Sequence, residues 1–211
     1  MKKKVTIITL CLATLIAGEA AAQKKQKAVP FKLSGTIRNF TGKTLYVHHI
    51  WEEKEFTDSM KVTDGKFSIE LKSPESNMYW INTAPFVNAP PNVMFFSDPK
   101  AEIKASIHAD SIPFAVITGG PSQKDYTDYK AMLNGFVSKQ QKMQAAYTEA
   151  MQKGDAAAME TIRNDFQNLN NDFINGMSYF VKQHPKSPVS GYIVYNDMNN
   201  PAVPFLSLIH I

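Results

Sequence analysis

From Phe31 onward, the chain has two stretches with different hydrophobic periods. Between Phe31 and about Gly120, short runs alternate apolar and polar residues at every second position, as in half-buried strands. The alternating runs are residues 31–37, 44–48, 60–62 and 66–71, and further strands are expected at residues 78–82, 93–97, 102–107 and 114–118. These short strands, without a helical stretch among them, predict an antiparallel β-sandwich or β-barrel.

Two turns predict which strands pair. A short turn separates residues 31–37 from residues 44–48, and we expect these two strands to form a hairpin. Residues 60–62 and 66–71 flank Thr63-Asp64-Gly65. An Asp-Gly pair between alternating strands is a strong hairpin signal, because glycine adopts the positive φ that such turns need. We therefore expect a second hairpin at this turn.

After Gly119-Gly120-Pro121 the apolar period changes to about 3.5 residues, which predicts helices. Ser122 is the expected N-cap, Lys153-Gly154-Asp155 the turn between two helices, and His184-Pro185 the end of the second. The apolar positions are Tyr126, Tyr129, Leu133, Phe136, Met143 and Tyr147, then Met159, Ile162, Phe166, Leu169, Phe173, Met177 and Phe180. Each set forms one stripe, so we expect an antiparallel helical hairpin with a buried seam, and an overall α+β fold.

The first residues have the order of a secretory signal peptide. Three lysines at positions 2–4 precede the apolar run Val5 to Ala17, and Ala20-Ala21-Ala22 precedes Gln23. A membrane anchor is the alternative, but a span needs about 20 apolar residues, and this run is shorter. We expect cleavage after Ala22 and export to the periplasm or cell envelope, with no transmembrane segment afterwards.

The only cysteine, Cys11, lies inside this apolar run. Cleavage would leave residues 23–211 without a thiol, which excludes disulfides, cysteine metal sites and cysteine nucleophiles there. It would also remove three lysines and Glu19, so the formal net charge of +4 would become +2. That value is too near neutral to indicate a nucleic-acid-binding protein.

No catalytic, cofactor-binding or metal-binding residue stands out. His48 and His49 are adjacent on a predicted strand and point to opposite faces, so they cannot easily share one ion. Ser59 has neither a glycine elbow nor a histidine placed as its base. The sequence does not predict an enzyme and requires no cofactor.

Aromatic residues are the one candidate binding signal. They are Trp51, Tyr79 and Trp80. Strand alternation sends Tyr79 and Trp80 to opposite faces, so one is expected in the core while the other could stack on a sugar or a partner protein. Burial in the core or against another domain is the alternative for all three.

The end of the chain departs from these patterns. Ser187-Pro188 predicts the start of a short helix. The last six residues, 206–211, fit no element and match the translation of CTG-TCT-CTT-ATA-CAC-ATC, a transposon adaptor used to prepare sequencing libraries. We expect this tail to be adaptor-derived and the natural protein to continue past Phe205; a natural apolar tail is the alternative.

Several of these segments resemble a known arrangement. They are Phe31 to Ile37, Asp58-Ser59, Asp64 to Phe67, Val116 to Ser122, and Phe180 to Tyr192. Together they resemble the uncharacterised N-terminal β-domain and linker helices that precede the thioredoxin-like domain of envelope thiol:disulfide interchange (TlpA-like) proteins in Gram-negative bacteria.

The activity of that family depends on a Cys-x-x-Cys motif, which this sequence lacks. The resemblance therefore implies a non-catalytic accessory module whose partner is a C-terminal thioredoxin-like domain absent from this chain, or other envelope proteins. A stand-alone envelope module that binds polysaccharide or protein is the alternative. We expect a signal peptide (1–22), a linker (23–30), a β-sandwich domain (31–120), a helical hairpin (121–184), a short helix with a truncated linker (185–205) and the adaptor-derived tail (206–211).

Overall fold

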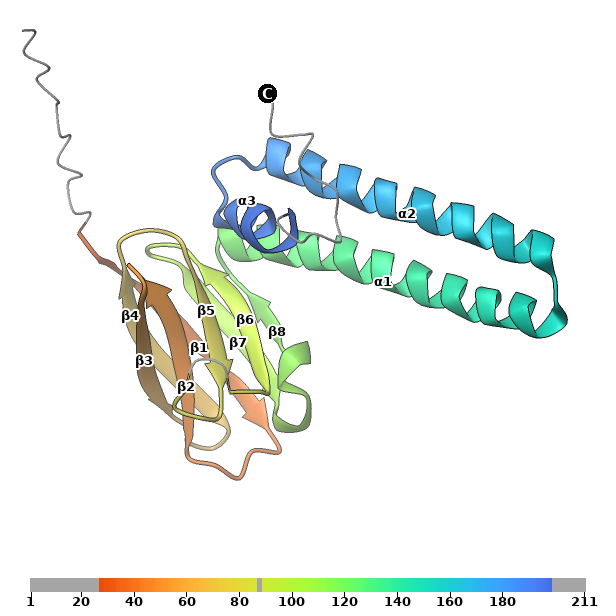
Figure 1. The fold of residues 1–211 in the computed structure, drawn as a ribbon. Coiled ribbons are helices and arrows are strands. Elements are labelled where there is room, and N and C mark those ends of the chain that lie inside the picture. Colours follow the sequence, from red (N-terminus) through yellow and green to blue (C-terminus); the bar gives the residue numbers. More distant parts are fainter. Residues whose placement is uncertain (1–26, 87–88, 199–211) are drawn as a thin grey trace, which may run out of the picture.

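Two β-sheets face each other and are followed by two long helices (Figure 1). The computed structural model describes residues 27–86 and 89–198, so the predicted signal peptide and adaptor-derived tail lie outside the described residues. The strands are β1 (Val29–Arg38), β2 (Thr44–Trp51), β3 (Lys54–Lys61), β4 (Lys66–Ser73), β5 (Asn77–Asn82), β6 (Asn92–Ser97), β7 (Glu102–His108) and β8 (Val116–Thr118). The helices are the 3₁₀ helix η1 (Ala109–Phe114), α1 (Pro121–Lys153), α2 (Ala156–Gln183), α3 (Pro188–Tyr192) and the π-helix η2 (Ile193–Met198).

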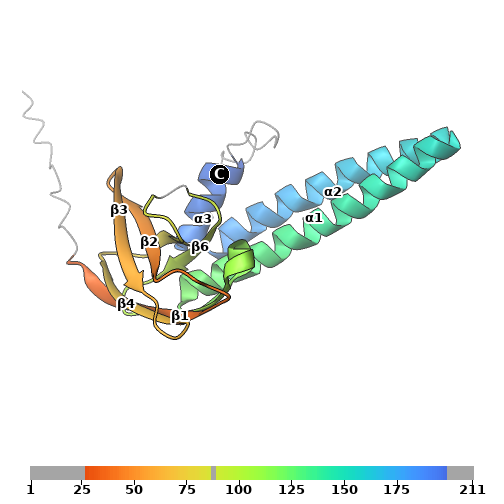
Figure 2. The ribbon, with the colours of Figure 1, turned by 90° about the horizontal axis from the view of Figure 1, so that it is seen from below.

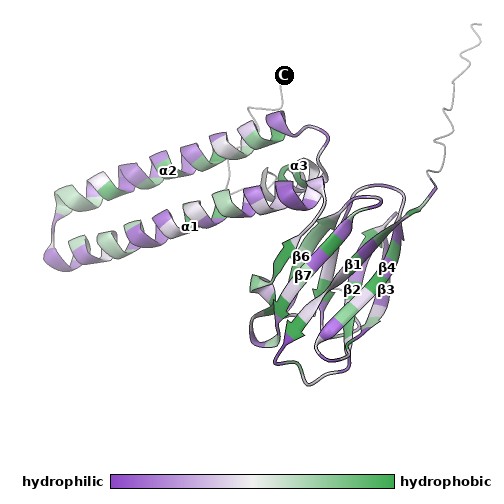
Figure 3. Ribbon diagram, turned by 180° about the vertical axis from the view of Figure 1, so that it is seen from behind, coloured by the Kyte–Doolittle hydropathy of each residue, from purple (hydrophilic) through white to green (hydrophobic). Residues whose placement is uncertain are grey.

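The predicted sandwich is confirmed. The first sheet has the strand order β4-β1-β7-β8, and the second sheet has the order β3-β2-β5-β6. Neighbouring strands are antiparallel except β1 and β7, which are parallel. Alternation along the strands places every second side chain in the core, as β7 shows with buried Ile103, Ala105 and Ile107. Figure 3 shows the same alternation of hydrophobic and hydrophilic residues.

The first predicted hairpin is wrong. Strand β1 pairs with β4 and β7, whereas β2 pairs with β3 and β5. The connection between β1 and β2 therefore crosses from one sheet to the other. Both sheets bury one face against the same core, so the alternation of the two strands is equally compatible with pairing and with facing each other across the core.

The second predicted hairpin is a tight turn whose strands then separate. Asp64 and Gly65 have φ of 51° and 70°, which is the positive backbone angle that the Asp-Gly pair predicted. One bridge joins Thr63 to Lys66, and beyond it β3 enters the second sheet while β4 enters the first. The turn was predicted correctly, and the two-stranded ladder was not.

The predicted helical hairpin is confirmed, and it extends away from the sandwich (Figures 1 and 2). Gly154 adopts a φ of 68° in the turn, and the Asp155 carboxylate accepts a hydrogen bond from the Ala158 N–H at 2.9 Å. The predicted start of α3 is also confirmed, because the Ser187 side chain caps the helix and Pro188 occupies its first position. No helix within residues 27–86 and 89–198 has the length and apolar content to cross a membrane.

The seam of the hairpin is buried only near the sandwich. There, Tyr129 and Met177 are buried, and they belong to a second hydrophobic cluster that includes Phe96 of β6, Val189 of α3 and Ile193. Towards the turn, the seam residues Leu133, Phe136, Phe166 and Leu169 are half-buried. The expectation of a buried seam therefore holds at the base of the hairpin and fails along most of its length, because only two helices are present to cover each stripe.

Candidate functional site

The sandwich and the hairpin meet at a polar junction around Asp98, which follows β6. The Ser122 N–H donates to Asp98 Oδ2 at 3.0 Å, and the Ser122 and Ser76 hydroxyls donate to Asp98 Oδ1 at 2.5 and 2.6 Å. A carboxylate at a helix N-terminus is favoured by the helix dipole and satisfies a free N–H group. The prediction that Ser122 is the N-cap is wrong: Gly120 holds that position, and Asp98 supplies the capping oxygens.

Two glycines allow the chain to approach this junction. Gly119 and Gly120 have φ of 110° and 78°. A Cβ atom on Gly119 would lie 2.0 Å from the Glu102 carbonyl oxygen, and one on Gly120 would lie 2.7 Å from Asp98 Oδ2. The break between sandwich and helices therefore requires glycine for both backbone conformation and space.

Gln123 connects the first turn of α1 to both sheets. Its side chain is 4% exposed. Gln123 Oε1 accepts a hydrogen bond from the Phe96 N–H at 2.9 Å, and Nε2 donates to the Ile117 carbonyl at 3.2 Å. Strand β6 is an outer strand of the second sheet, and β8 is an outer strand of the first. One side chain thus satisfies a backbone group on the edge of each sheet.

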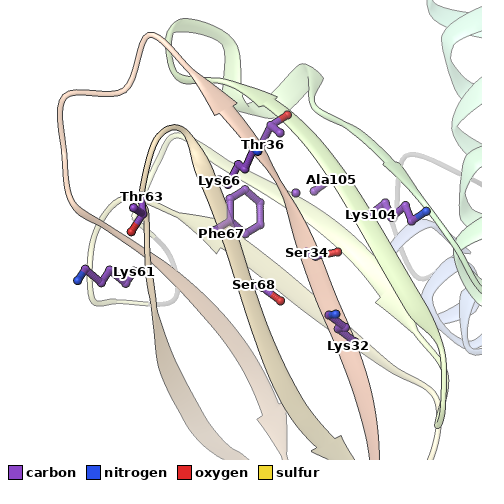
Figure 4. A pocket seen from close by; sticks show the side chains of 11 residues that line it. Lys32, Ser34, Thr36, Lys61, Thr63, Lys66, Phe67, Ser68, Lys104 and Ala105 are labelled. Atoms are coloured by element: carbon purple, nitrogen blue, oxygen red, sulfur yellow. The ribbon is translucent and has the colours of Figure 1, made fainter.

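A shallow concavity lies on the first sheet (Figure 4). It has a volume of about 570 Å³ and is bordered by β1, β4, β7 and the end of β3. Its charged and hydroxyl-bearing lining residues are Lys32, Lys61, Lys66 and Lys104, with Ser34, Thr36, Thr63 and Ser68. We call this set the lysine-hydroxyl face. No carboxylate lines it, so its local charge is positive.

A second, smaller groove of about 250 Å³ lies between α3 and the second sheet. Met78 and Phe96 of the sheet line it together with Tyr192 and Tyr195. Phe96 and Tyr192 pack edge to face at 6.1 Å, so part of this groove belongs to the hydrophobic cluster that fixes α3 in place.

The structure does not gather the three predicted aromatics into one site. Tyr79 is 1% exposed in the sandwich core and packs against Phe31 and Phe95 at 5.0 and 5.3 Å. Trp80 points to the opposite face of β5 and is half-buried, as is Trp51 at the end of β2. Tyr79 is therefore a core residue, and Trp80 and Trp51 keep some accessible surface.

The two adjacent histidines point to opposite faces, as predicted. His48 is fully buried, and its ring nitrogens are hydrogen-bonded to Thr57 Oγ1 at 2.8 Å and Asn82 Oδ1 at 2.9 Å. His49 lies between Phe56 and Tyr79, with ring centroids at 4.9 and 5.2 Å. Burial lowers the pKa of His49, and the nearby Asp58 carboxylate opposes this shift more weakly.

Metal binding has no support from side-chain geometry in the described ranges. Among residues 27–86 and 89–198, no three His, Cys, Asp or Glu side chains are grouped so that they could hold an ion.

Sequence reasoning missed the lysine-hydroxyl face. Its residues occupy the polar positions of alternating strands, for example Lys32, Ser34 and Thr36 on β1. The sequence pattern predicts that these positions face solvent. Their assembly into one surface depends on the pairing of β1 with β4 and β7, and that pairing was not predicted.

Part of the chain matches a known protein family. Residues 31–126 match a family described as a domain of unknown function (DUF4369). The matched segment contains the sandwich strands from Phe31 onward, the Asp98 junction and the first turn of α1. No curated protein and no solved structure matches the chain.

Proposed function

We propose that this chain is the non-catalytic N-terminal accessory module of an exported thiol:disulfide interchange protein, in which it positions a thioredoxin-like domain or that domain's partners. The proposal starts from the resemblance of residues 31–37, 116–122 and 180–192 to such modules. The match of residues 31–126 to a domain family without an assigned function is compatible with an accessory role.

The attachment of α1 to the sandwich is the observation that carries the proposal. Gln123 binds the edges of both sheets, and Asp98 binds the first turn of the helix. Because Ser122 and Gln123 both bind the sandwich, the first turn of α1 is held against it. A helix of 33 residues is about 50 Å long at 1.5 Å per residue. A fixed sandwich with a long helical extension suits a module that sets the distance and orientation of a neighbouring domain.

The gene provides the first test. We expect the reading frame in the source genome to continue past codon 205 and to encode a Cys-x-x-Cys motif in a thioredoxin-like sequence. A native stop codon at that point would overturn the proposal and favour the alternative, a stand-alone envelope module that binds polysaccharide or protein.

The intact protein provides the second test. Gln123→Ala should loosen the attachment of α1 without touching the redox centre. We expect unchanged reduction of insulin, a general substrate, and slower disulfide exchange with the protein's own envelope partners. Gln140→Ala, at an exposed position of α1, is the matched control. Equal rates for both variants with every substrate would contradict a positioning role.

A further inference from the structure

Strand register brings hydroxyl and ammonium groups together on the outer surface of the first sheet. Ser34 on β1 lies opposite Ser68 on β4 and Lys104 on β7. Thr36, two residues further along the same face, lies opposite Lys66 on β4. Adjacent strands are about 4.8 Å apart, so these side chains can reach a common point above the sheet. Figure 4 shows Ser34 between Ser68 and Lys104, and Lys66 beside Thr36.

Within residues 27–86 and 89–198, the lysines of this face form no ion pair; they are Lys32, Lys61, Lys66 and Lys104. Two cross-strand carboxylates, Glu70 and Glu102, lie opposite Lys32 on its two sides. They weaken the positive potential at that end. Glu102 also lies two residues from Lys104 on the same exposed face of β7, so the potential is least offset near Lys66.

The chemistry of the lining favours a tetrahedral oxyanion. Lysine acts as a point charge and is a common phosphate ligand, and hydroxyl groups donate hydrogen bonds to phosphate oxygens. A planar carboxylate is best matched by the two-pronged guanidinium of arginine, and no arginine lines this concavity. Its one aromatic residue, Phe67, is buried beneath the sheet surface and is unavailable to stack on a base, which disfavours a nucleic acid.

We propose that the lysine-hydroxyl face binds a phosphate-bearing ligand. Lys66 and Lys104 supply the charge, and Ser34 and Thr36 supply hydroxyl donors to the phosphate oxygens. The open shape of the concavity suits a phosphate group presented on a larger molecule, either a soluble phosphorylated glycan or a lipid headgroup. This site is separate from the α1 junction on which the proposed function rests.

Titration of the ¹⁵N-labelled full chain with inorganic tripolyphosphate tests the site. Saturable chemical-shift changes should be confined to β1, β4 and β7 around Ser34, Thr36, Lys66 and Lys104. Binding should weaken as salt is raised, because exposed charges are screened over about 10 Å at 0.1 M ionic strength. The absence of saturable binding, or shifts spread over lysines throughout the chain, would overturn the proposal.

Two double variants separate a specific site from general attraction. Lys66→Gln with Lys104→Gln should weaken tripolyphosphate binding about tenfold or more, since each removed charge lies next to the bound anion. Lys139→Gln with Lys142→Gln removes the same charge from exposed positions of α1 and should leave the affinity unchanged. Equal weakening in both double variants would overturn the site.

A third variant tests the hydroxyl groups without changing the charge. Ser34→Ala with Ser68→Ala should weaken binding about threefold to tenfold, because neutral hydrogen bonds to the anion are lost. Thermal unfolding of each variant, followed by circular dichroism, establishes that the fold is retained. Unchanged affinity in this variant would overturn the assignment of hydroxyl donors.

Three further probes identify the source of the phosphate. Co-sedimentation with phosphatidylglycerol vesicles, but not with phosphatidylcholine vesicles, would indicate a lipid headgroup. Tripolyphosphate binding without vesicle binding would indicate a soluble phosphorylated ligand. Polygalacturonate, a carboxylate polymer, should bind at least about tenfold more weakly per charged group than tripolyphosphate. Equal affinity per charged group for tripolyphosphate and polygalacturonate would overturn the preference for phosphate.

Discussion

The side-chain oxygen of Gln123 accepts a hydrogen bond from the backbone N–H of Phe96 at 2.9 Å, and both residues are buried. The other end of the same amide donates to the Ile117 carbonyl at 3.2 Å. Unpaired backbone groups on edge strands are common starting points for aggregation. Here a single helix residue satisfies one such group on each sheet, so α1 both continues the chain and protects the sandwich.

Replacement of Gln123 should therefore destabilise the fold. We expect Gln123→Ala to lower the free energy of unfolding by about 2–4 kcal/mol, because it leaves two buried backbone groups without partners. Urea unfolding of the purified chain measures this change. Gln140→Ala on the exposed part of α1 should change it by less than about 0.5 kcal/mol. A similar small effect at Gln123 would show that water replaces its hydrogen bonds.

Two glycines should respond in opposite directions to alanine. Gly119→Ala should cost more than about 3 kcal/mol, because its φ of 110° and a Cβ only 2.0 Å from the Glu102 oxygen both oppose a side chain. Gly135, inside α1, has no neighbour within 4 Å of its Cβ position. Gly135→Ala should therefore raise stability by about 0.5–1 kcal/mol through helix propensity. Thermal unfolding of both variants measures this contrast, and destabilisation by Gly135→Ala would contradict it.

The apolar and polar pattern located most of the strands, although β3 spans Lys54–Lys61 where only residues 60–62 were predicted. Residues 102–107 were predicted as a strand, and β7 spans Glu102–His108. Pairing was not predictable in the same way. Strands β1 and β7 pair in parallel, with Lys32 opposite Glu102. These residues are far apart in sequence, and no local turn between them predicts the pairing. The lysine-hydroxyl face depends on this pairing, which is why its residues were visible in the sequence while the surface was not.

The junction shows a second limit of local reasoning. Ser122 is a residue type favoured at N-caps and lies near the helix start, yet its hydroxyl and N–H both bind Asp98, which follows β6. A capping carboxylate supplied by a distant strand leaves no signal near the helix start. Gly119-Gly120, by contrast, was identified as a break between two structural units, and the close approaches of the backbone explain why both residues are glycine.

Two phenylalanines, Phe96 at the base of the hairpin and Phe166 in its outer seam, should differ in their contribution to stability. A fully buried seam would make Phe166→Ala cost about 3 kcal/mol or more. Phe166 is only half-buried, so we expect about 1–2 kcal/mol. Phe96, which is 1% exposed beneath α1 and α3, should cost about 3–5 kcal/mol when replaced by alanine. Urea unfolding compares the two, and equal losses would indicate that another surface covers the outer seam in solution.

Acid should destabilise the sandwich through His49. Burial between Phe56 and Tyr79 holds the pKa of His49 below its ordinary value of 6.5, and the Asp58 carboxylate only partly offsets this effect. The unfolded chain therefore binds a proton at His49 more readily than the folded chain does. Stability should rise with pH in the range just below 6.5 and fall on acidification through it.

His49→Phe tests this assignment, because it keeps an aromatic ring between the same neighbours and removes the titrating group. The loss of unfolding free energy between about pH 7.5 and about pH 5.5 should be smaller in this variant than in the unmodified chain. Urea unfolding at several pH values measures the two slopes. Identical slopes would show that other groups cause the acid sensitivity and that the His49 ring is solvated well enough to titrate normally in the folded chain.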